Sequence, residues 1–125
     1  MSAQRCKKVI SSLVLLVSFA TSTLVIAHAH LQSQTPAADS TVTPPTELRL
    51  NFSEGIEEKF TKVVLTTNTG KTVSVKSIAT AVGDKKTLVV TPATPLVAGQ
   101  YHVEWHAVSV DTHKSDGSYA FKVSP

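Results

Sequence analysis

Apolar residues alternate with polar residues along most of this chain, and this two-residue period limits the fold to β-structure. The segments 47–52 and 100–108 both carry apolar side chains at every second position, which is the pattern of a strand with one buried face. Further strands are expected at 62–66, 71–78, 87–91 and 117–123, and at most one helical turn at 57–60. Strands that recur about every ten residues between Gly and Pro turns predict an all-β fold, an Ig-like, Greek-key antiparallel β-sandwich of about seven strands.

Two short motifs support this prediction. Asn68-Thr69-Gly70 separates two expected strands and is typical of a hairpin turn. Leu96, Gly99 and Tyr101 have the spacing of a tyrosine corner, in which the phenol bonds to an upstream backbone group. The corner is a structural feature and suggests no chemistry.

The chain begins with a basic segment, followed by an uncharged apolar stretch at 9–26. Val25 and Ala27 are small enough for the positions that signal peptidase recognises. We therefore predict a cleaved signal peptide at 1–27, a periplasmic location, and one mature domain at 28–125. A transmembrane anchor is the alternative for the apolar stretch, since its length is close to that needed to span a bilayer.

Cleavage after Ala29 also fits the small-x-small rule and would leave His30 first. Either cut changes the composition of the chain. The leader holds three of the 12 Lys and Arg residues and none of the 9 Asp and Glu residues, so the mature side chains sum to zero charge. Nucleic-acid binding is therefore not expected. The single Cys and the single Met, Cys6 and Met1, are also lost. Any metal must then be held by nitrogen and oxygen.

Cleavage before His28 would create a chelating residue. A free α-amine and an imidazole from one histidine can bind the same ion, and Asp111 and His113 supply a carboxylate and a second imidazole further along the chain. Nitrogen and oxygen ligands in a tetragonal arrangement suit Cu(II). The alternative is that these are unrelated surface residues, because the Asp-x-His spacing is common.

Three segments together resemble the CopC family of periplasmic copper-binding proteins, and its YobA-like members in particular. They are 28–31 (HAHL, followed by TPA at 35–37), 51–54 (NFSE) and 105–113 (WHAVSVDTH). Each segment is weak alone, but they occur in the family's order over essentially the whole mature chain. The register of the first segment also favours cleavage before His28.

The resemblance implies one Cu(II) ion per chain, bound by His28, Asp111 and His113. In some members the Glu of the F-S-E motif approaches the metal, so Glu54 is either a further ligand or a solvated carboxylate. Other members have a Met-rich Cu(I) site, which the mature part of this chain cannot form. The resemblance also implies a soluble, monomeric copper carrier or buffer, with a CopD-like inner-membrane copper transporter as its partner.

The remaining polar residues allow several interpretations. His30 could bind Cu(II) through backbone amides if no strand pairing used them, or could lie just outside the ligand shell. His102, Glu104 and His106 share one strand face and form either a weak metal patch or an ordinary solvated surface. Ser109 and Thr112 are expected to orient the ligands rather than to bind the metal, as outer-shell hydrogen-bond donors do.

Two other classes of function compete with the carrier. A histidine brace also occurs in lytic polysaccharide monooxygenases, which are copper enzymes that need an open coordination position and a broad substrate surface. A sandwich of this size could also be an adhesion or glycan-binding module with no metal, since fold alone does not fix function. The carrier is the leading hypothesis, and no enzymatic activity is expected.

Overall fold

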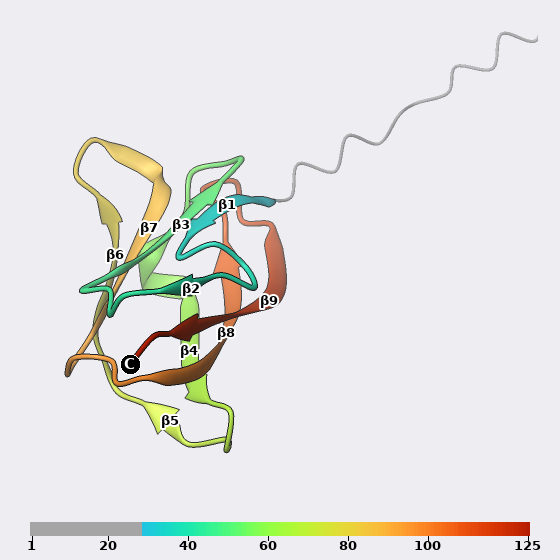
Figure 1. Ribbon diagram of the computed structural model, residues 1–125. Helices are drawn as coiled ribbons and strands as arrows, with labels where there is room; N and C mark the ends of the chain where they lie inside the picture. The colour runs from blue at the N-terminus through green and yellow to red at the C-terminus, as the bar shows by residue number, and fades with distance from the viewer. Residues whose placement is uncertain (1–28) are drawn as a thin grey trace, which may run out of the picture.

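The computed structural model describes residues 29–125, which form a two-layer β-sandwich (Figure 1). The predicted signal peptide and His28 lie outside the described residues. The strands are β1 (Leu31–Thr35), β2 (Thr41–Val42), β3 (Leu48–Phe52), β4 (Lys62–Thr67), β5 (Thr72–Val73), β6 (Val75–Ala81), β7 (Asp84–Pro92), β8 (Gly99–Val108) and β9 (Lys114–Val123). A 3₁₀ turn, η1 (Glu58–Phe60), is the helical turn that the sequence allowed.

One sheet has the strand order β1-β3-β7-β6 and the other β2-β9-β8-β4-β5. The chain passes between the sheets after β1, β2, β3, β5 and β7, in agreement with the predicted sandwich. All pairs are antiparallel except β2 and β9, which run parallel over two residues. The predicted antiparallel sandwich thus has one short parallel pair at this edge, because the chain reaches β2 from the other sheet rather than through a hairpin.

The expected strand at 71–78 is divided into two. Its first part, β5, pairs with β4 and completes the hairpin predicted around Gly70, which has a φ of 86°. Its second part, β6, pairs with β7 in the opposite sheet. A continuous stretch of β-forming residues therefore switches sheets at Ser74, which the alternation of side chains did not indicate.

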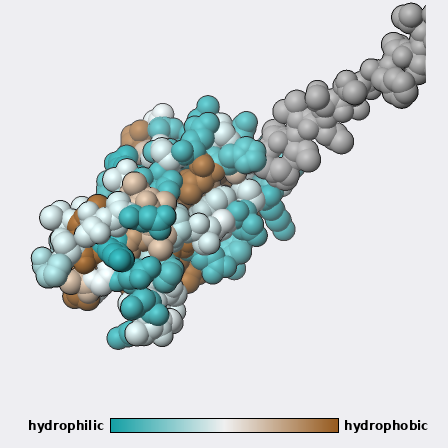
Figure 2. Space-filling view, turned by 45° about the vertical axis from the view of Figure 1, so that its right-hand side comes forward, coloured by the Kyte–Doolittle hydropathy of each residue, from teal (hydrophilic) through white to brown (hydrophobic). Residues whose placement is uncertain are grey.

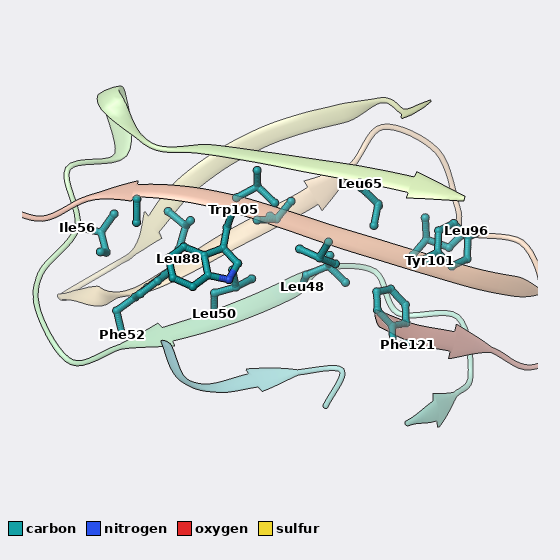
Figure 3. Close-up of a cluster of buried hydrophobic side chains, with 14 of the residues drawn as sticks. Leu48, Leu50, Phe52, Ile56, Leu65, Leu88, Leu96, Tyr101, Trp105 and Phe121 are labelled. Carbon is teal, nitrogen blue, oxygen red and sulfur yellow. The ribbon is translucent and has the colours of Figure 1, made fainter. Parts of the chain in front are cut away.

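The core contains the residues that the alternation placed on the inner faces (Figure 3). Phe52 and Trp105 meet edge to face with ring centroids 5.2 Å apart, and Tyr101 and Phe121 stack at 5.6 Å. These aromatic contacts join the two sheets at one end of the core and β8 to β9 at the other. The Tyr101 hydroxyl donates a hydrogen bond to the Val97 carbonyl at 2.7 Å, which confirms the tyrosine corner.

On the face shown in Figure 2, the outer surface of the molecule is mostly polar, and hydrophobic residues form separate patches among hydrophilic ones. Within residues 29–125, no helix has the length and apolar character needed to cross a membrane.

Gly117 is required by the packing of Trp105. The two residues face each other across the β8–β9 ladder, and a Cβ at position 117 would lie 2.5 Å from Cζ2 of the indole and 2.8 Å from Cε2. The ring is held by Phe52 on the opposite sheet, so it cannot move away without disturbing the core. A glycine in mid-strand is ordinarily unfavourable. Here it leaves the space in which the indole of Trp105, the largest side chain of the core, packs over position 117.

We therefore expect Gly117→Ala to lower the free energy of unfolding by about 1–3 kcal/mol, the usual effect of overpacking. Urea denaturation monitored by Trp105 fluorescence would measure the change. The matched control is Ser118→Ala on the same strand, whose exposed side chain should change stability by no more than about 0.5 kcal/mol. Equal stabilities of Gly117→Ala and the parent chain would show that the indole has room to move.

Candidate metal centre

The turn from Ser109 to His113 joins β8 to β9 and holds two of the predicted ligands. The Ser109 amide donates to the His113 carbonyl at 2.9 Å, and the Thr112 amide donates to the Ser109 carbonyl at 2.8 Å. Thr112 has a φ of 71°, a left-handed conformation that closes the turn at some cost for a β-branched residue. Because Ser109 is fully buried, the turn is anchored to the core at its first residue.

Asp111 and His113 project from this turn toward each other. His113 Nδ1 lies 3.0 Å from Asp111 Oδ2, and the two side chains are 48% and 39% exposed. Two ligand atoms about 2.0–2.1 Å from one metal ion and at right angles to each other are about 3 Å apart. The pair therefore has the separation of two neighbouring ligands of one ion, and without an ion the same separation makes a hydrogen bond.

The Asp111 carboxylate is held in its ionised form. The Ser109 hydroxyl donates a hydrogen bond to Oδ1, and this bond is the main reason why the pKa of Asp111 is lowered; His113 lowers it further. An ionised carboxylate is the form that binds a metal, so weakly acidic conditions leave this group ready to bind. The expectation that Ser109 orients a ligand agrees with this contact, whereas the Thr112 hydroxyl donates to the Asp111 backbone carbonyl instead.

The start of β1 is fastened beside this turn, as Figure 1 shows. The Ser115 hydroxyl donates to the Ala29 carbonyl at 2.7 Å, and the His30 amide donates to the Ser53 hydroxyl at 2.8 Å. Ala29 is fully buried. Sequence reasoning missed both serines, because an isolated Ser has no characteristic spacing and its partners lie 86 and 23 residues away.

Glu54 lies on a loop that packs against the same turn. The Val110 amide donates to the Gly55 carbonyl at 2.9 Å, and Ile56 forms a bridge with Ser109. Within residues 29–125, however, no three His, Cys, Asp or Glu side chains come together to hold a metal. The described structure brings Asp111 and His113 together without adding Glu54 to them, and a role for Glu54 stays a prediction. His28, the remaining predicted ligand, lies outside the described residues.

The other histidines are distributed as follows. The His30 amide is already used by Ser53, so copper binding through that amide would have to break a strand contact. His102 and His106 are exposed on the outer face of β8, opposite the buried Trp105.

Comparison with known proteins identifies the family. The model of the CopC domain matches residues 31–124, which is nearly the whole described part of the chain. The chain belongs to the CopC family. The resemblance seen in the three sequence segments is thereby confirmed.

Several relatives match over most of their length. Copper resistance protein C of Pseudomonas syringae pv. tomato is 45% identical over 107 residues, covering 82% of this chain and 85% of the relative. Protein YobA of Escherichia coli K12 is 43% identical over 100 residues, covering 79% and 81%. The crystal structure of PcoC, a methionine-rich copper resistance protein from Escherichia coli, superposes with a TM-score of 0.72 at 41% identity, covering 78% of this chain and 100% of PcoC.

The contact between Ser109 and Asp111 gives a test of the electrostatics of the turn. Replacing Ser109 by Ala should raise the pKa of Asp111 toward the ordinary range, because the largest stabilisation of the charged form is removed. NMR titration of the Asp111 carboxyl carbon would measure the pKa.

The matched control is Thr112→Val, which removes a hydroxyl that does not touch the carboxylate and keeps the branched side chain. It should leave the pKa of Asp111 nearly unchanged. If Ser109→Ala left it unchanged too, His113 would be the group that holds the carboxylate in its charged form.

Proposed function

We propose that this chain is a periplasmic Cu(II) carrier or buffer that serves copper resistance or homeostasis. The single observation that carries the proposal is the pairing of Asp111 and His113 at 3.0 Å on an exposed turn. Membership of the CopC family supports it, since the relative from Pseudomonas syringae and PcoC are both named as copper resistance proteins. One tightly bound Cu(II) ion per monomeric chain is the proposed stoichiometry of this site.

The proposed ligand set is His28, Asp111 and His113, with Glu54 as a further candidate. The anchoring of Ala29 by Ser115 supports a role for His28, because Ser115 follows His113 by only two residues. Neighbouring Cα atoms are about 3.8 Å apart, so a residue joined to Ala29 starts close to this turn. Removal of the leader at 1–27 would give His28 the free amine that the brace needs.

The donor set favours one oxidation state. The chain has one methionine, Met1, and one cysteine, Cys6, both within the predicted leader. PcoC is described as methionine-rich, and soft sulfur ligands are those that select Cu(I). This chain is therefore proposed to bind Cu(II) without an accompanying Cu(I) site, and to deliver it to a CopD-like inner-membrane transporter.

We propose binding rather than catalysis. In an oxygen-activating copper site, one coordination position stays open for the reactant. Here the Asp111 carboxylate stands beside His113 at a ligand's separation, so it would occupy such a position. Reductant-dependent oxygen consumption by the copper-loaded chain would contradict this proposal.

The first test is Cu(II) titration of two forms of the mature chain, one beginning at His28 and one with an added Gly before it. We expect tight one-to-one binding only in the first form, because the extra residue removes the α-amine from the chelate. Isothermal titration calorimetry would give the affinity, and electron paramagnetic resonance would count the nitrogen ligands. Equal affinities would exclude an N-terminal brace, and no binding by either form would exclude the carrier.

A second test concerns the residues that hold the start of β1. Ser115→Ala should weaken Cu(II) binding by about 10–100-fold, the usual effect of removing an outer-shell partner, because Ala29 is no longer tied beside His113. The matched control is Ser33→Ala, whose hydroxyl lies on β1 itself and accepts a hydrogen bond from Asn51. Equal affinities of the two variants would show that the Ser115 tether does not position the site.

A further inference from the structure

We propose that the outer face of β8 and β9 carries a second, weaker Cu(II) site, with His106 and Glu104 as its ligands. It is separate from the turn that holds Asp111 and His113. It does not depend on the proposed brace, because none of its residues belongs to that ligand set.

Two ligand atoms are already placed for one ion. Residues 104 and 106 alternate with buried residues along β8, so both side chains point to solvent. His106 Nε2 lies 3.3 Å from Glu104 Oε1, close to the separation of about 3 Å expected for two neighbouring ligands of one ion. Imidazole and carboxylate together suit borderline divalent metals, and Cu(II) binds most tightly in that series.

Asp116 supports the histidine from the neighbouring strand. It stands directly opposite His106 in the β8–β9 register, and its Oδ2 lies 4.0 Å from His106 Nδ1. Without a metal, the hydrogen bond of the ring is the one between Nε2 and Glu104. A metal bound at Nε2 would leave the ring proton on Nδ1, the side that faces Asp116. Metal-binding histidines are usually oriented in this way by a carboxylate on the second ring nitrogen.

The two proposed ligands are accessible enough for a hydrated ion to reach them, but their exposure and a nearby positive charge predict weak binding. Glu104, His106 and Asp116 line a shallow hollow with Gly117 and Ser118. The side chains of the two ligands are 62% and 52% exposed, so water would fill the other coordination positions. Lys62 faces His106 from β4 and adds a repelling charge. Two protein ligands are also consistent with the lack, in the described chain, of any three-residue cluster that could hold a metal.

The position of the site suggests its use. Asp116 follows His113 by three residues, a distance on the order of 10 Å along an extended strand. A weak site so near the turn would hold a second ion when copper is in excess of one equivalent. Its role would be to take up copper at high concentration and to release it readily.

The experiment is a two-step Cu(II) titration of the mature chain followed by ¹H–¹⁵N NMR, with Cu(II) alone as the probe. NMR signals that broaden on addition of the first equivalent of Cu(II) report binding at the turn that holds Asp111 and His113. Signals that broaden only on addition of the second equivalent report binding at the new site. We expect the second equivalent to broaden the amide signals of residues 104–106 and 116–118. In His106→Asn this second step should disappear, while the first step is unchanged.

His102→Asn is the matched control, because His102 lies on the same face of β8 outside the cluster. It should keep both steps. Asp116→Asn should weaken the second step by about 10–100-fold, as expected for an outer-shell carboxylate. A second step that persists in His106→Asn, that broadens other residues, or that is absent from the parent chain would each overturn the proposal. Copper binding at the proposed brace is measured only in the first step, so failure of the brace can be distinguished from failure of the second site.

Discussion

The pairing of β8 with β9 is the interaction on which the rest of this structure depends. The two strands stay in register from Gly99 opposite Val123 to Val108 opposite Lys114 without a bulge. Every second residue of β8 from Tyr101 to Ala107 is buried, and β9 adds Phe121 and Val123 to the same core. The same ladder therefore holds Trp105 against Phe52, carries His106 on the outside and closes on the turn that bears Asp111 and His113.

The turn is held to the core by hydrogen bonds at one buried residue, Ser109. Ser109 uses its hydroxyl and its backbone to hold Asp111 and the His113 carbonyl, and the loop at Gly55 closes over Val110. The two candidate ligand side chains, Asp111 and His113, are thus held beside each other without a metal. Preorganisation of this kind lowers the entropy lost on binding, and it is more dependable on strand ends than on a free loop.

The core of the sandwich could be predicted from the sequence, because alternation depends on local burial alone. The inner faces of β3 and β8 and the tyrosine corner of Tyr101 were found in this way. The predictions failed where the fold is decided by distant partners. β1 has a polar pattern and was missed as a strand, and the sheet switch at Ser74 depends on pairing with β7.

The candidate site shows the same division. The Asp-x-His spacing could be read from the sequence because both residues sit on one turn. The tethers from Ser53 and Ser115 could not, because they join segments that only the folded chain brings together. The family resemblance supplied the ligands, and the fold supplies the scaffold that would hold them.

The exposure of the site bears on whether a carrier can release its metal. A metal held in a closed shell of buried ligands would exchange slowly, since each ligand must leave before another can replace it. Asp111 and His113 lie at the end of the sandwich and are about half exposed, so a receiving protein could approach them without opening the core. Tight binding would then come from chelation by several ligands, and release from the accessibility of each. A rigid scaffold with ligands at its rim meets both requirements, whereas a buried site would meet only the first.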